Sequence, residues 1–149
     1  MKEKTYSYDE AFEAALQYFK GDELAARVWV NKYSMKDSYG HIYEVSPEGM
    51  HWRIANEIAR IENKYENPLK AEEIFGLLDH FKYIIPAGSP MTGIGNNHQI
   101  ASLSNCFVIG LDGQADSYGG IIRIDEEQVQ LMKRRGGVGH DLSHIRPTG

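Results

Sequence analysis

The 149-residue sequence contains a single cysteine, so no disulfide can form within the chain. It has no apolar run approaching the ~20 residues that span a bilayer, and its first residues, MKEKTYSYDEAF, lack the apolar segment of a secretory signal. A net charge of −5 offers no general attraction to nucleic acid or to an anionic membrane. These absences exclude a disulfide scaffold and a membrane span. They favour a cytoplasmic protein with neither nucleic acid nor membrane as partner.

The first half of the chain has helical periodicity. Ser7 and Glu10 form an S-x-x-E capping pattern, and Ser46 followed by Pro47 predicts a second helix start. Two apolar stripes at helical spacing follow, formed by Met50, Ile54, Ile58 and Ile61 and by Ile74, Leu77, Leu78 and Phe81. We interpret both stripes as faces that pack in a core, because nothing in them demands a ligand.

The pattern changes near residue 83. Residues 83–97 contain two prolines and several glycines, which predicts a loop, and residues 106–112 have the apolar density of a buried strand. The expected fold class is α+β, with a helical domain at residues 1–83 and the opening of an α/β domain at residues 84–149. One strand and one helix cannot complete a sheet, so the α/β part looks unfinished.

The region after the strand predicts one more helix. Residues 116–124 are typical of a turn followed by a short strand or a helix start. Asp125 and Gln128 then predict the cap of a helix whose last turn is basic, which suits the helix dipole.

A glycine-rich stretch, RRGGVGHD, occupies residues 134–141. Gly136, Gly137 and Gly139 leave space for a ligand to approach the backbone, and consecutive N–H groups in such a loop can bind phosphate. The spacing matches neither the dinucleotide fingerprint nor the Walker loop. Composition by itself favours a helix C-cap followed by a turn.

Several polar residues flank this stretch. His140 and His144 have the spacing of a metal pair on a helix, but the Glu of H-E-x-x-H is missing and the preceding glycines disfavour a helix. Arg146 suits either a phosphate or an acidic side chain. Asp116 and Ser117 predict a turn, and whether they also bind a ligand stays open.

The only cysteine, Cys106, lies in the segment SLSNCFVIG. A lone cysteine is either a buried, inert apolar residue or a thiol that does chemistry. The residues by themselves favour the inert alternative.

Taken together, SLSNCFVIG, DSYGGI and MKRRGGVGHDLSHIRPTG, in this order, resemble the N-terminal part of the large, catalytic subunit of ribonucleotide reductase. The likeness is greatest to the adenosylcobalamin-dependent class II branch. It implies a helical lobe followed by the first strands and helix of an incomplete α/β barrel. It also implies reduction of ribonucleotides by thiyl-radical chemistry, with adenosylcobalamin as a cofactor whose contacts lie mostly outside this chain.

The resemblance implies roles for particular residues. Cys106 corresponds to one of the two cysteines that supply the reducing electrons, and not to the radical cysteine. The implied substrate-binding residues are Ser89, Ser104, Asn105, Gly136 and Gly137. The implied effector-binding residues are Asp116, Ser117 and Arg146.

The chain also departs from the family. Members are several times longer and use three cysteines, whereas this chain has one. We therefore expect no activity from the chain alone. Its implied partners are a ribonucleotide substrate, a deoxyribonucleoside triphosphate effector and the remainder of the reductase, as a C-terminal chain or domain. The alternatives are a non-catalytic relic that binds a nucleotide or associates through its unfinished sheet, and a small unrelated helical protein.

Overall fold

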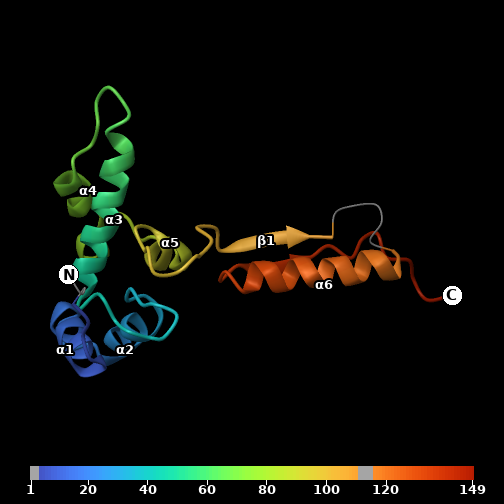
Figure 1. The fold of residues 1–149 in the computed structure, drawn as a ribbon, viewed down its shortest axis with the longest axis horizontal. Helices are drawn as coiled ribbons and strands as arrows, with labels where there is room; N and C mark the ends of the chain where they lie inside the picture. The colour runs from blue at the N-terminus through green and yellow to red at the C-terminus, as the bar shows by residue number, and fades with distance from the viewer. Residues whose placement is uncertain (1–3, 111–115) are drawn as a thin grey trace. The chain divides into compact units, whose positions relative to one another are not determined.

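The computed structural model describes residues 4–110 and 116–149. The chain divides into two compact units, Met1–Ile100 (unit 1) and Ala101–Gly149 (unit 2), so the division falls later than the expected boundary at residue 83. Unit 1 is helical, and unit 2 combines one helix with a two-stranded parallel sheet (Figure 1). No helix in the two described stretches is long and apolar enough to cross a membrane.

The helices of unit 1 begin where the capping residues predict. Ser7 is the N-cap of α1, and it forms a reciprocal capping box in which its own N–H donates to the Glu10 carboxylate at 2.7 Å. Ser46 caps α3, with Pro47 in its first turn. The elements of this unit are α1 (Tyr8–Tyr18), α2 (Glu23–Lys32), α3 (Pro47–Glu62), α4 (Ala71–Leu78), η1 (Asp79–Phe81) and α5 (Gly88–Gly93).

The core of unit 1 forms around α3, which packs against α4 and contacts α1 (Figure 1). Met50 and Ile54 of the first predicted stripe and Ile74 and Leu78 of the second are buried. Each stripe has one member at the surface, Ile61 at the end of the first and Leu77 within the second. Ile58 and Phe81 are partly buried against the core.

The segment 83–97 is not the continuous loop that its prolines and glycines predict. It contains the short helix α5, in which Met91 and Thr92 are buried. The expectation fails because tertiary contacts hold this segment on unit 1: the side chain of Arg53 reaches the carbonyl oxygens of Met91 and Ile94. These contacts also account for the later division between the units.

A polar cluster lies inside unit 1 where α1, α3 and η1 meet. The hydroxyl of Tyr18 donates to Asp79 Oδ1 at 2.9 Å, accepts from the backbone N–H of His80 at 2.6 Å, and lies 3.2 Å from Nδ1 of His51. His51 is fully buried, and among the described residues its Nε2 atom has no hydrogen-bond partner. A proton added to Nε2 would therefore be buried without an acceptor.

This burial makes the stability of unit 1 depend on pH. Desolvation lowers the pKa of His51 below its ordinary value of 6.5, opposed by the nearby Asp79 carboxylate and reinforced by the charges of His80 and Arg53. Below pH 6.5 the unfolded chain binds a proton at His51 that the folded chain does not, so folding stability falls as the pH falls.

We expect the free energy of unfolding to be lower at pH 5.5 than at pH 7.5, and this loss to be smaller in His51→Gln. Each unit of pKa depression corresponds to about 1.4 kcal/mol. Urea unfolding at both pH values measures the difference. His140→Gln is the control, because His140 is exposed and lies in unit 2. Equal losses in the wild type and in His51→Gln would contradict the prediction.

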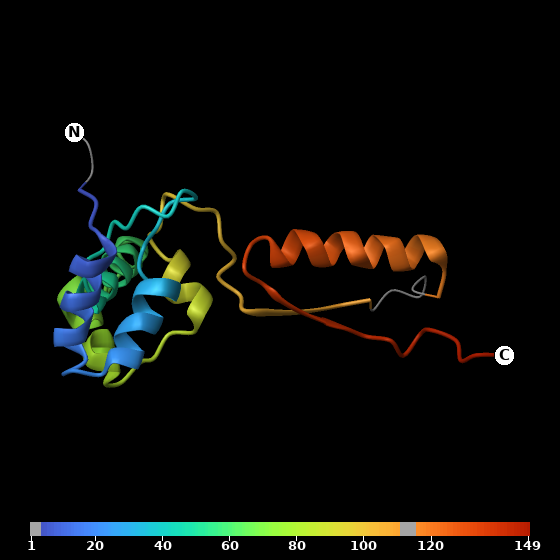
Figure 2. The same cartoon turned by 90° about the horizontal axis from the view of Figure 1, so that it is seen from below.

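Unit 2 is a strand–helix–strand arrangement. β1 (Cys106–Ile109) and β2 (Gly137–His140) pair in parallel, with Cys106 opposite Gly137 and Ile109 opposite His140. α6 (Tyr118–Met132) connects them and lies along the strands (Figure 2). Only the first part of the predicted strand 106–112 can be compared, because residues 111–115 lie outside the described residues.

One sequence prediction for unit 2 is wrong and another is right only in part. The helix begins at Tyr118 and not at Asp125, because the Ser117 side chain caps it by accepting from the N–H of Gly120 at 3.0 Å; of the alternatives for residues 116–124, the structure shows the helix start. The stretch 134–141 begins with the predicted turn after the end of α6, but its later glycines lie in strand β2. Parallel pairing with β1 supplies hydrogen bonds that the glycine composition does not predict.

Gly136 is required by the packing of α6 on β1. It is buried, and a Cβ atom at this position would lie 2.8 Å from Cε2 of Phe107 and 3.1 Å from the carbonyl oxygen of Leu131. A larger residue would push the turn away from the strand. The absence of a side chain is therefore a packing requirement here, independent of any ligand.

Candidate functional site

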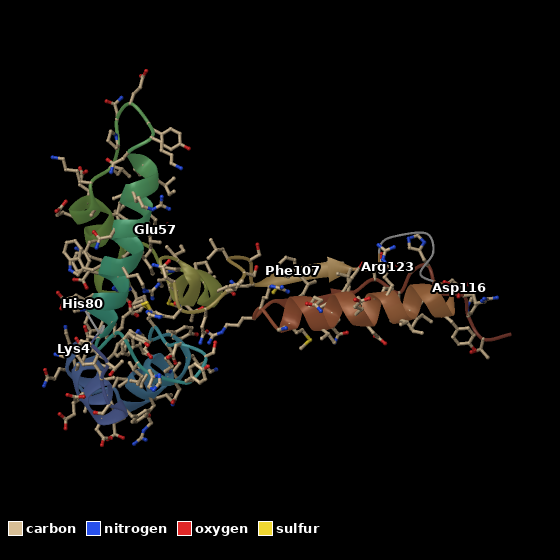
Figure 3. All side chains as sticks on the ribbon, viewed as in Figure 1. Lys4, Glu57, His80, Phe107, Asp116 and Arg123 are labelled. Atoms are coloured by element: carbon tan, nitrogen blue, oxygen red, sulfur yellow. The ribbon has the colours of Figure 1, made fainter. Side chains whose placement is uncertain are left out.

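The predicted site residues of unit 2 lie near the two ends of helix α6. Phe107, beside Cys106, and Asp116, just before α6, lie toward opposite ends of this helix (Figure 3). A helix of 15 residues is about 22 Å long. The candidate redox residue and the candidate effector residues therefore form two separate places in unit 2.

The first place surrounds the thiol of Cys106, which is exposed. Gly137 is its partner across the sheet, and a Cβ atom on Gly137 would lie 3.6 Å from Sγ. The absence of a side chain at position 137 thus leaves the space beside the sulfur open. The sequence by itself favours a buried, inert cysteine, and the expected burial is wrong, because Cys106 is exposed.

The neighbouring predicted substrate residues lie on the same approach to β1. Asn105 and Ser104 immediately precede Cys106, and the N–H of Ser104 donates to the hydroxyl oxygen of Ser102 at 3.0 Å. The N–H groups of Gly136 and Gly137 donate to the carbonyl oxygens of Leu131 (3.0 Å) and Asn105 (2.6 Å) respectively. Because these two N–H groups already have acceptors, this loop does not form the phosphate-binding nest that its glycines allow.

The second place is a pocket of about 450 Å³ at the start of α6. It brings together the three predicted effector residues Asp116, Ser117 and Arg146, which lie up to 30 positions apart in the sequence. Its lining residues are Asp116, Ser117, Tyr118, Ile121 and Arg146.

The charges of this pocket pair with each other. Nε of Arg146 lies 2.9 Å from Oδ2 of Asp116, so of the two alternatives for this arginine the structure shows an acidic partner. The Arg146 side chain is 75% exposed, and ion pairs this exposed contribute little to stability. The N-terminus of α6, with its positive dipole end, adjoins the same pocket. A ligand with hydroxyl groups and phosphates would find an acceptor, a cation and a helix N-terminus here.

The remaining candidates lie elsewhere. Ser89 lies in α5 of unit 1, and its residue surface is 5% exposed. His140 ends β2 and His144 follows it, so these histidines do not share the helix that a metal pair would need. Within the described ranges, no three His, Cys, Asp or Glu side chains are placed to hold a metal ion.

Sequence reasoning missed two residues of the pocket, Tyr118 and Ile121. Tyr118 directly follows the N-cap Ser117, and Ile121 lies about one turn further along α6. Recognising Ser117 as an N-cap, from the pattern of a Ser before an apolar helical run, would have placed them.

These features define a class: a helical domain followed by a strand–helix–strand unit with an exposed cysteine at its first strand. The family model described as "Ribonucleotide reductase, all-alpha domain" matches residues 19–99, which is more than half of the chain. The chain belongs to this family, and its unit 1 is the N-terminal all-alpha domain of a ribonucleotide reductase large subunit.

A named relative supports the assignment. The chain is 28% identical over 131 residues to the ribonucleoside-diphosphate reductase subunit alpha of Helicobacter pylori strain J99. The match covers 88% of this chain and 16% of the relative. The chain thus spans about a sixth of the length of that protein.

The exposure of Cys106 has a direct chemical consequence. We expect its thiol to react with 5,5′-dithiobis(2-nitrobenzoate) in the folded protein at a rate within about threefold of that in urea, because exposed thiols react without unfolding. The measurement is unambiguous, since Cys106 is the only cysteine in the sequence. Labelling that requires denaturant would show that the thiol is buried in solution. Cys106→Ser is the blank.

Proposed function

We propose that this chain forms the N-terminal part of a ribonucleotide reductase in which Cys106 is one of the reducing cysteine pair. The observation that carries the proposal is the exposed thiol on β1, opposite Gly137, in a chain of this family. Ser104, Asn105, Gly136 and Gly137 surround the same strand and would contact the ribonucleotide.

The proposed reduction needs two thiols, of which this chain supplies one and a cysteine outside this chain the other. The bond between C2′ of the ribose and its hydroxyl oxygen breaks, the oxygen leaves as water, and a C2′–H bond replaces it. Two thiols supply two electrons and two protons and become a disulfide. Cys106 provides one sulfur. The second sulfur and the radical cysteine would come from the remainder of the reductase, together with most of the barrel.

The radical generator is a finer part of the proposal. The motifs favour adenosylcobalamin, whereas a reductase with a separate radical-generating subunit is the alternative. Among the described residues, no three His, Cys, Asp or Glu side chains are placed to hold a metal ion. We therefore place the cofactor contacts outside this chain and derive no step through it. The named relative favours diphosphate substrates.

We also propose that the pocket at the start of α6 binds a deoxyribonucleoside triphosphate effector. Asp116 would accept a hydrogen bond from the deoxyribose hydroxyl, and Arg146 would turn to the phosphates, helped by the N-terminus of α6. Exposed charges of this kind can exchange partners at little expense in stability.

The effector proposal is tested by titrating the chain with dTTP in a calorimeter. We expect Arg146→Gln to weaken binding at least tenfold, which corresponds to about 1.4 kcal/mol. Arg134→Gln is the matched control, because Arg134 lies beyond the other end of α6 and bonds to Gln130. Equal effects of the two variants, or no binding by the wild type, would contradict the effector role.

The catalytic proposal predicts that the purified chain alone does not convert ADP to dADP, even with adenosylcobalamin and dithiothreitol present, because one cysteine cannot form the disulfide. Product analysis by liquid chromatography measures this. Turnover by the 149-residue chain would contradict the proposal, whereas turnover that appears only when the missing part of the reductase is added, and that Cys106→Ser abolishes, is the expected result.

The alternative function is a relic that associates through its sheet. The observation in its favour is that a two-stranded sheet leaves strand edges open, and Val108 of β1 is 66% exposed. Light scattering distinguishes the two: association that grows with concentration, combined with no response to dTTP, would favour the relic.

A further inference from the structure

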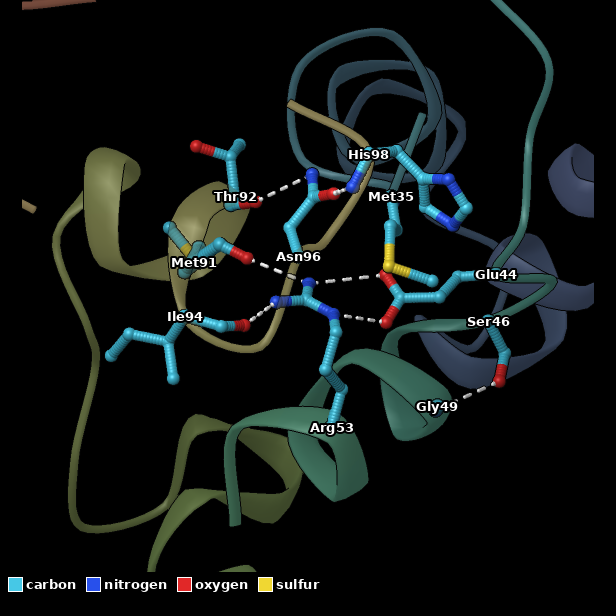
Figure 4. Close-up of polar contacts among 10 residues, drawn as sticks. All are labelled: Met35, Glu44, Ser46, Gly49, Arg53, Met91, Thr92, Ile94, Asn96 and His98. Carbon is cyan, nitrogen blue, oxygen red and sulfur yellow. Dashed lines mark hydrogen bonds and ion pairs between the residues drawn. The ribbon is translucent and has the colours of Figure 1, made fainter. Parts of the chain in front are cut away.

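A buried ion pair joins Arg53 of α3 to Glu44, which lies in the connection between α2 and α3. The side chains of Arg53 and Glu44 are 9% and 6% exposed, and Nε of Arg53 donates to Oε1 of Glu44 at 2.6 Å (Figure 4). Nη2 donates to the second carboxylate oxygen at 3.2 Å, so the contact is bidentate. That second oxygen also accepts from the N–H of Met35 at 2.9 Å. The carboxylate is therefore satisfied from two directions.

Arg53 also donates hydrogen bonds to the C-terminal end of helix α5. Nη1 donates to the carbonyl oxygen of Ile94, and Nη2 donates to that of Met91 at 2.8 Å (Figure 4). These carbonyls belong to the last turn and C-cap of α5, where no later N–H of the helix can reach them. Arg53 thus caps α5 with a side chain from another helix.

α5 needs such outside support. It has six residues, far below the 12 to 15 or so at which isolated helices become even marginally stable. The chain leaves it through Gly95, whose φ of +70° favours glycine. A Cβ atom there would lie 2.9 Å from Cγ of Arg53, so this backbone runs directly along the arginine stem.

The segment beyond α5 stays attached to unit 1 up to its last residues. The Asn96 side chain donates to the carbonyl oxygen of Thr92 at 3.1 Å, and the Gln99 side chain donates to that of Asp37 at 2.7 Å. The same chain then continues in sequence into β1 and Cys106. Ser89, to which the family resemblance gives a substrate-binding role, lies in the first turn of α5.

We propose that Arg53 and Glu44 are a positioning pair, whose task is to hold α5 and the chain that leaves unit 1 rather than to stabilise the helical core. The carboxylate neutralises the buried guanidinium and orients its fork toward two backbone carbonyls. Through this fork the all-alpha domain sets the position of α5 and of Ser89 in its first turn. That functional consequence rests on the proposed function, but the capping of α5 does not.

The test separates local order from global stability. In Glu44→Gln/Arg53→Met both charges are gone, while the glutamine oxygen can still accept from Met35, so no unpaired charge remains buried. We expect a thermal midpoint within about 5 °C of the wild type. Hydrogen exchange should accelerate at least tenfold at the amides of Met91, Ile94 and His98, while those of α1 and α3 keep their protection.

The matched control lies on the same helix. Glu57 and Arg60 form an ion pair of the same 2.6 Å length, but the Arg60 side chain is 61% exposed. Glu57→Gln/Arg60→Met should leave exchange in α5 unchanged. The single variant Arg53→Met leaves the Glu44 carboxylate buried without its arginine and should lower the midpoint by more than the double variant does. The double variant keeps the test valid if the single one fails to fold.

Two results would overturn the proposal. Unchanged exchange in α5 of the double variant would show that the pair does not hold this segment. Faster exchange throughout unit 1, with a matching fall in the midpoint, would show a purely structural role in the core. Neither measurement uses a nucleotide, so failure here is distinguishable from failure of the dTTP titration or of the turnover experiment, which test the proposed function.

Discussion

Unit 1 depends on the burial of one face of α3. Met50 and Ile54 on this face contribute to the core that α1, α2 and α4 complete, and His51 between them has no exposed surface. Arg53 lies on the border of the same face, where its charge is balanced by Glu44 and its remaining donors reach backbone carbonyls. The helix therefore contributes both the apolar packing of the domain and the polar contacts that hold its last segment.

Unit 2 follows from a different constraint, the parallel pairing of β1 with β2. Parallel strands require a crossover, and α6 supplies it, which places the helix N-terminus at the ends of the strands away from Cys106. One consequence is that the thiol and the pocket of Asp116 and Arg146 cannot act on the same atoms. In a reductase this separation suits a reaction site and a distinct binding site that regulates it, which is the division of roles that we propose.

Membership of the ribonucleotide reductase family rests on unit 1, since the family model matches residues 19–99. The proposed chemistry rests on unit 2, where Cys106 lies. The connection between them is the segment that Arg53 and Glu44 hold. The helical domain holds α5, its last helix, through the buried side chain of Arg53.

The sequence by itself determined the features that depend on neighbouring residues. The capping box of Ser7 and Glu10 and the start of α3 at Ser46 and Pro47 are short-range interactions, so their patterns predict them correctly. Helical periodicity places Met50 and Ile54, and likewise Ile74 and Leu78, on one face, and these four residues are buried as predicted. The order of the motifs also sufficed to indicate the family.

Only the tertiary structure decided the rest. The glycine-rich stretch contains strand β2 because it pairs with β1. The short helix α5 is capped by Arg53, whose side chain donates to carbonyl oxygens at the end of the helix. Asp116 and Arg146 met because the crossover brings the chain back after α6. These outcomes depend on groups distant in sequence, whose hydrogen bonds and packing outweigh local propensity. Cys106 is exposed in the structure, where its residue type favours burial.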